Sequence, residues 1–173
     1  HLRIRVLQAV YAFFQNGNTE LSKGEKQLLT SVEKIHELFV YQLSFLIEIR
    51  DFAENHITES KKKFFPTEED LDPNMRFVQN RVLKQIEENR DFRRLHDKLK
   101  INWSEEESTV RNAYKSIKKS GFYEKYMNNA EDSYEVDSDL LVRIVKKVFS
   151  SEELLEYYYE SRSVFWAFDA YHT

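Results

Sequence analysis

The chain has 173 residues and a formal net charge of −4 at pH 7, with 32% of its residues charged and 41% hydrophobic. This length allows one domain with a sizeable core, and the composition is that of a soluble globular protein. There is no cysteine, which excludes disulfides, thiol catalysis and cysteine-ligated zinc and is typical of a reducing cytoplasm. Because the net charge is weakly acidic, nucleic-acid binding would require a local basic patch.

The first fifteen residues predict an amphipathic helix. At about 100° per residue, His1, Arg5 and Gln8 fall on a polar stripe. The opposite face is apolar, is expected to dock on the rest of the molecule, and consists of Leu2, Val6, Val10, Phe13 and Phe14. No Asp or Glu precedes Glu20, so this end of the chain is cationic. Residues 15–19, QNGNT, predict the turn that ends the helix.

The longest helical pattern covers about residues 20–60. Between Leu38 and Ile49 the apolar residues surround the helix, which indicates a central helix buried on most sides. We expect the most buried positions to include Phe39, Leu43, Leu46 and Ile49. The run Lys61–Lys63 and then Pro66 end this pattern, and an acidic loop follows over residues 67–74.

The next helices are predicted from their start signals. Pro73 is expected in the first turn of a helix that runs to about residue 89. A short helix follows over about residues 91–99. Ser104 and Glu107 have the spacing of a capping box, which predicts the start of another helix.

The last third of the chain predicts further helices around an acidic stretch. Gly121 is expected to end a helix as a left-handed C-cap. Residues 128–139 are predicted to form an acidic linker, with Ser138 or Asp139 capping the helix that follows. A final helix is expected over about residues 150–161.

These elements predict an all-α fold in a single domain over residues 1–173. We expect a bundle of seven to eight helices with one long central buried helix, and helix in more than roughly two thirds of the residues. Only three glycines and two prolines are present, which favours helices over many short strands.

The motifs of common enzyme classes are missing from the sequence, so we expect a non-enzymatic protein without cofactor or metal. There is no phosphate-binding glycine loop and no nucleophile elbow. Glu33 and His36 match half of a di-iron helix motif, but that chemistry needs two such motifs and two further glutamates. A solvated polar pair is the favoured interpretation. The apolar run from Leu38 to Ile49 is too short to span a membrane, which takes about 20 residues.

Two further features have a structural and a functional interpretation. The basic runs Lys61–Lys63, Arg93–Arg94 and Lys118–Lys119 are each interpreted as solvated helix faces or ends rather than as nucleic-acid contacts. The aromatic residues within 157–171 could stack on RNA bases. Their glutamate neighbours would repel phosphate, so burial in the core or in an interface is favoured.

The segment from Arg3 to Ala12, RIRVLQAVYA, resembles the opening helix of the NusB family of transcription antitermination factors. The closest branch carries a long extra helical segment before the usual domain. The resemblance continues through residues 43–57, 61–74, 100–103 and 163–173, and so covers most of the chain. The family's C-terminal motifs do not occur here, which implies a fragment lacking the C-terminal half and trimmed at its N-terminus.

The resemblance implies a cytoplasmic factor in transcription antitermination and termination, which binds boxA-type RNA together with the ribosomal protein NusE. Other Nus factors and the RNA polymerase complex would be further partners, without a membrane. Arg3 matches an arginine of the family's RNA-binding segment. His1 and Arg5 stand where basic residues are common, and Tyr11 matches a tyrosine expected at the partner interface.

Alternatives remain open at this point. Tyr11 could instead pack the first helix on the second. The chain could be a helical scaffold that acts through protein contacts only, without RNA. A helical, metal-dependent enzyme is the least favoured alternative, because the residues for it are missing.

Overall fold

The computed structural model describes residues 2–15, 17, 20–65, 67–163 and 166, without the side chains of Leu2, Arg5 and Glu69. In this part of the chain 78% of the residues are helical and no strand occurs, so the all-α fold is confirmed. In chain order the elements are α1 (Leu2–Gln15), α2 (Leu21–Lys61), α3 (Glu68–Leu71), α4 (Arg81–Glu88), α5 (Arg90–Leu99), α6 (Glu107–Lys119), α7 (Gly121–Met127), α8 (Tyr134–Lys147), the short 3-10 helix η1 (Phe149–Ser151) and α9 (Glu153–Arg162).

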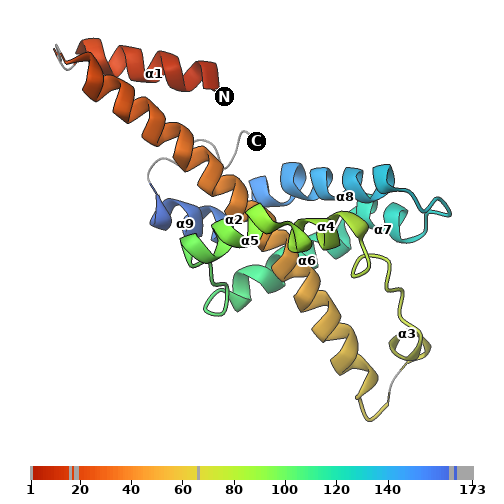
Figure 1. The fold of residues 1–173 in the computed structure, drawn as a ribbon. Coiled ribbons are helices and arrows are strands. Elements are labelled where there is room, and N and C mark those ends of the chain that lie inside the picture. Colours follow the sequence, from red (N-terminus) through yellow and green to blue (C-terminus); the bar gives the residue numbers. More distant parts are fainter. Residues whose placement is uncertain (1, 16, 18–19, 66, 164–165, 167–173) are drawn as a thin grey trace.

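Helix α2 is the axis of the molecule (Figure 1). It has 41 residues, which corresponds to a length of about 60 Å at roughly 1.5 Å per residue. Helices α4, α5 and α6 pack on its middle, α1 folds back along its N-terminal part, and α3 lies near its C-terminal end. The two ends of α2 therefore extend beyond the bundle in opposite directions.

The core forms where the middle of α2 meets the shorter helices. Phe45 and Ile49 of α2 are completely buried, as are Leu83 of α4 and Ile117 of α6. Trp103, in the loop before α6, packs on Phe45 at 4.7 Å between ring centroids. Its indole Nε1 donates a 2.9 Å hydrogen bond to the hydroxyl of Ser44, so the one polar atom of the ring is satisfied inside the core.

Two of the four positions expected to be most buried differ from the prediction. Leu46 and Ile49 are buried, but Phe39 is 54% exposed and Leu43 is only partly buried. The reason is an open groove between α2, α4 and α5, whose wall includes Phe39, Leu43 and Phe92. Helical periodicity identified an apolar surface around α2, but α4 and α5 leave this side of it open.

Two predicted helix starts are wrong. The helix expected from Pro73 begins only at Arg81, because the side chain of Asn80 accepts hydrogen bonds from the backbone of Val82 and Leu83 and caps α4 there. The capping box at Ser104 does not form. Helix α6 begins after Glu106 instead, and its N-cap makes no side-chain hydrogen bond.

Gly121 does not end α6 as a left-handed cap. Ser120 ends α6 and also caps α7, since its hydroxyl accepts a hydrogen bond from the backbone N–H of Tyr123. Gly121 is the first residue of α7, and among the described glycines only Gly17 has a positive φ.

The acidic linker expected over residues 128–139 is shorter than predicted and covers only residues 128–133. Helix α8 begins at Tyr134 and is capped by Ser133, so Ser138 and Asp139 lie inside the helix rather than at its start. Asp137 is 2% exposed, because tertiary hydrogen bonds bring it into the interior. Helix α9 begins at Glu153, close to its predicted position.

Three of the four aromatic residues that the structure describes within residues 157–171 are buried, as favoured above. Tyr158, Tyr159 and Trp166 are each less than 5% exposed, and the indole of Trp166 donates a 2.8 Å hydrogen bond to the carbonyl of Lys34. Tyr157 is the exception at 73% exposure. Phe165, Phe168 and Tyr171 lie outside the described residues.

Candidate nucleic-acid interface

Helices α1 and α2 form a hairpin that extends beyond the bundle (Figure 1). Gly17, at a φ of +60°, lies in the connection between them. The helices approach closely at Gly24, where an added Cβ would lie 2.9 Å from a ring carbon of Phe13. Glycine at this position therefore permits the contact that holds α1 on α2.

The hairpin contains a groove of about 560 Å³ between its two helices. Lys23 and Lys26 line it from α2, and the small side chains of Ala9 and Ala12 line it from α1. Lys23 forms a 3.0 Å ion pair with Glu20, which is weak because both groups are exposed. Lys26 makes no ion pair within the described part of the chain, so its charge is available to an anionic ligand.

Of the three predicted RNA contacts, the structure describes the side chain of one. Arg3 is exposed near the start of α1 and makes no ion pair with a described residue. The backbone of Arg5 belongs to α1, but its side chain and the whole of His1 lie outside the described residues. Helix α1 contains no carboxylate that could neutralise these arginines.

Tyr11 does not pack α1 onto α2. Its ring is 65% exposed, and its hydroxyl accepts a 2.9 Å hydrogen bond from the side chain of Gln15 on the same helix. The packing alternative for Tyr11 is therefore wrong. Ala9, Ala12 and Phe13, which are partly buried, turn toward α2 in its place.

The apolar face expected to dock is largely exposed. Val6 and Val10 are 45% and 46% exposed, and Phe14 is 75% exposed. Together with Leu7 and Tyr11 they make a continuous apolar surface on a helix that also bears cations. Exposed apolar surface of this extent is typical of a site that binds another macromolecule.

The hairpin is the basic part of an acidic chain. Residues 1–30 contain four Lys or Arg and two Glu, a net charge of +2, which leaves −6 on the remainder. A local basic patch of the kind that an acidic chain needs for nucleic-acid binding thus lies on α1 and the start of α2. Lys23 and Lys26 were not predicted as site residues, since only the pairing of α1 with α2 brings them next to the arginine-bearing helix.

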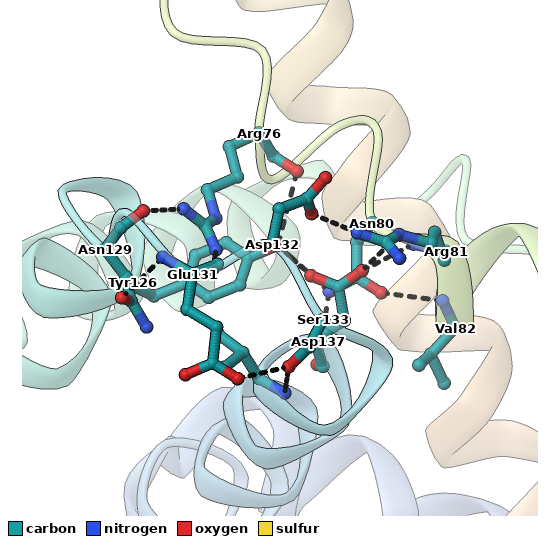
Figure 2. Close-up of polar contacts among 11 residues, drawn as sticks. Arg76, Asn80, Arg81, Val82, Tyr126, Asn129, Glu131, Asp132, Ser133 and Asp137 are labelled. Carbon is teal, nitrogen blue, oxygen red and sulfur yellow. Dashed lines mark hydrogen bonds and ion pairs between the residues drawn. The ribbon is translucent and has the colours of Figure 1, made fainter.

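A second polar cluster lies inside the bundle (Figure 2). The side-chain amide of Asn80 donates to the hydroxyl of Tyr126 at 3.3 Å and to the backbone carbonyl of Asp137 at 3.2 Å. The Tyr126 hydroxyl donates to the Asp137 carboxylate at 2.8 Å, and that carboxylate also accepts from the backbone N–H of Arg81. Burial and the bond to Asp137 raise the pKa of Tyr126 to about 12.

The arginines at the edge of this cluster join the segment before α4 to the loop before α8. Arg76 donates to the backbone carbonyls of Asn129 and Glu131, and Arg81 pairs with Asp132 (Figure 2). Because most of these donors and acceptors satisfy one another, the cluster holds the two segments together.

The structure offers no constellation for metal binding in the part it describes. Glu33 and His36 are both exposed on α2, and no group of three His, Cys, Asp or Glu side chains among the described residues could hold a metal ion. Within the same residues, no helix has the length and apolar character needed to cross a bilayer.

Comparison with protein-family models, with curated proteins and with solved structures finds no match. The function is therefore inferred from the residues of this chain.

Proposed function

We propose that this chain acts as a NusB-like factor in transcription antitermination and termination, and that it binds boxA-type RNA through the α1–α2 hairpin. The observation that carries the proposal is the basic groove beside α1. Arg3 and Lys26 are exposed and free of ion pairs within the described residues, on a hairpin of net positive charge. Cations of this kind bind the phosphates of a single strand.

The apolar face of α1 supports a protein partner beside the RNA. Leu7, Tyr11 and Phe14 are each at least 65% exposed, and aromatic residues of this kind are typical anchors of protein interfaces. We assign this face to the ribosomal protein NusE, with other Nus factors and the RNA polymerase complex as further partners. The proposed role is non-enzymatic and needs no cofactor.

The RNA part of the proposal is tested by reversing two charges on α1. The double variant Arg3→Glu, Arg5→Glu should bind boxA-type RNA more weakly than the parent. The salt dependence of its affinity should also be shallower, by roughly 0.7 in log–log slope for each phosphate that the variant no longer neutralises. The matched control is Arg90→Glu, Lys98→Glu, which makes the same charge change on the exposed face of α5 and should bind more tightly than the α1 variant.

Equal affinity of the α1 variant and its control would contradict the RNA proposal. A scaffold that works through protein contacts only would then be the better account, since the exposed apolar face favours a protein partner independently of RNA. Tyr11→Ala with Phe14→Ala should weaken NusE binding in either case. NusE binding unaffected by this change would remove α1 from the protein interface.

A further inference from the structure

The opposite end of α2 presents two adjacent aromatic rings to solvent. Phe64 and Phe65 follow the end of the helix and are 90% and 84% exposed. Their ring centroids lie 4.7 Å apart with the planes at 89°, so the two rings offer faces in different directions. A single exposed apolar side chain is ordinary, but an adjacent pair at the tip of a long helix is the kind of feature that contacts a ligand.

Three lysines directly precede this aromatic pair in the chain. Lys63 forms a 3.0 Å ion pair with Asp70. The backbone N–H of Thr67 and the Lys63 ammonium lower the pKa of that carboxyl to about 2, so it stays charged and neutralises Lys63 at neutral pH. Lys61 and Lys62 are exposed and make no ion pair within the described residues, which leaves two positive charges beside the rings.

A second set of basic residues lies on the side of the bundle, on α6. Arg111, Lys115 and Lys118 of α6 are spaced by four and three residues and share one face of that helix. They line a groove of about 550 Å³ between α6 and the C-terminal half of α2. A neighbouring groove of about 380 Å³ shares Lys118 with it and is also lined by Asp70, the partner of Lys63, and by Asp72.

The groove also contains aromatic surface. Phe52 and Tyr114 line it and pack edge to face at 5.6 Å, and the ammonium of Lys118 lies 5.8 Å from the centroid of the Tyr114 ring. Glu59 and Glu107 are the carboxylates of its wall, and Glu107 is engaged by Arg111. Lys115 and Lys118 make no ion pair within the described residues.

We propose that the tip residues Phe64 and Phe65 and this groove form a second contact for single-stranded RNA, called the α2–α6 surface below. Bases stack on the exposed rings, and the phosphates follow Lys61, Lys62 and then Lys115 and Lys118 along the groove. Proteins that bind single strands combine a basic groove that tracks the backbone with aromatic platforms for the bases in this way. The choice of RNA as ligand rests on the proposed function.

The position of the α2–α6 surface makes it separate from the hairpin. Figure 1 shows α1 and the end of α2 on opposite sides of the bundle, separated by most of the length of α2. A strand held at both ends would run along the molecule. A lipid bilayer is the competing ligand for lysines next to phenylalanines, but a flat membrane would meet only the tip, whereas the basic residues continue into a groove.

The first measurement is the affinity of the whole chain for a fluorescent single-stranded RNA of about 12 nucleotides, a length within the range that such grooves cover. Phe64→Ala with Phe65→Ala should weaken binding by about fivefold or more, because losing one stacked base costs at least that factor. Tyr157→Ala, which removes another exposed aromatic ring on α9, is the control and should bind as the parent does.

The second measurement concerns the groove. Lys115→Ala with Lys118→Ala should reduce the log–log salt slope by about 1.4, which corresponds to two neutralised phosphates. Lys146→Ala with Lys147→Ala removes the same charge from the exposed end of α8 and should leave the slope unchanged.

The outcomes separate this inference from the proposed function. If the α2–α6 variants bind RNA as the parent does while Arg3→Glu, Arg5→Glu binds poorly, the hairpin is the RNA site and the inference is overturned. If only the α2–α6 variants are impaired, the inference stands and the hairpin proposal fails. A parent that binds vesicles of phosphatidylserine and phosphatidylcholine through Phe64 and Phe65, but no RNA, overturns both.

Discussion

The hydroxyl of Tyr126 donates a 2.8 Å hydrogen bond to Oδ1 of Asp137, and both side chains are almost fully buried. This bond joins α7 to the first turn of α8. The second oxygen of the same carboxylate accepts the backbone N–H of Arg81 at 3.1 Å, so one side chain connects three helices. A buried carboxylate is costly unless its oxygens are satisfied, and these two donors offset that cost.

Removing the hydroxyl of Tyr126 should reveal the cost of burying the Asp137 carboxylate. We expect Tyr126→Phe to lower the free energy of unfolding by about 1–3 kcal/mol, since it leaves a buried acceptor without its donor. Tyr134→Phe is the control, because its hydroxyl bonds Gln85 at the surface and should matter by about 0.5 kcal/mol or less. Urea unfolding followed by circular dichroism measures both. Equal losses of unfolding free energy in the two variants would mean that the buried hydrogen bond stabilises the fold no more than the surface one.

Buried tyrosines should make the fold sensitive to alkali. Burial raises the pKa of Tyr126 and of Tyr158 to about 12, and it also raises the pKa of Tyr123 and of Tyr159 well above the ordinary value. In the unfolded chain these hydroxyls ionise near pH 10. The folded state therefore keeps protons that the unfolded state releases, and its stability is constant below about pH 10 and falls as the pH rises toward about 12.

Urea unfolding at a series of alkaline pH values, with tyrosinate absorbance recorded alongside, tests this expectation. Tyr126→Phe should make the free energy of unfolding decrease less steeply with rising pH. Stability that stays flat up to about pH 12 would contradict it.

Truncating a side chain to alanine should lower the free energy of unfolding by different amounts on the two sides of α2. Leu46→Ala should cost about 2–5 kcal/mol, because Leu46 is 2% exposed in the packed core. Phe39→Ala removes a larger side chain but should cost about 1 kcal/mol or less, since Phe39 is 54% exposed at the edge of its groove. A larger loss for Phe39 than for Leu46 in urea unfolding would show that the groove is closed in solution.

Glycines 24 and 121 should respond in opposite ways to alanine. At Gly24 a Cβ would meet the ring of Phe13 at 2.9 Å, so Gly24→Ala should loosen α1 from α2 and reduce the hydrogen-exchange protection of α1. At Gly121 nothing lies within 4 Å, and the residue is helical, so alanine should stabilise the protein by about 0.4–1 kcal/mol. Unchanged protection of α1 in the Gly24 variant would show that the ring moves aside freely.

The sequence by itself determined the features that depend only on residues close together in the chain, within a few helical turns. The α1 and α2 segments match the predicted ranges to within about a residue, because apolar periodicity and a single turn signal at Gly17 define them locally. The cationic character of the first segment is likewise a property of composition alone. The expectation for Arg3, an exposed cation near the start of a helix, needed no tertiary information.

Only the tertiary structure decided which sides of these helices are covered. Asp137 was expected in an acidic linker, yet it is buried because Tyr126 and Arg81, 11 and 56 residues away in the chain, donate to its carboxylate. The exposure of Phe39 and the position of Lys26 beside α1 likewise depend on how separate helices pack together. Periodicity defines a face within a helix, but whether another helix covers that face depends on contacts between segments far apart in sequence, and no local pattern encodes them.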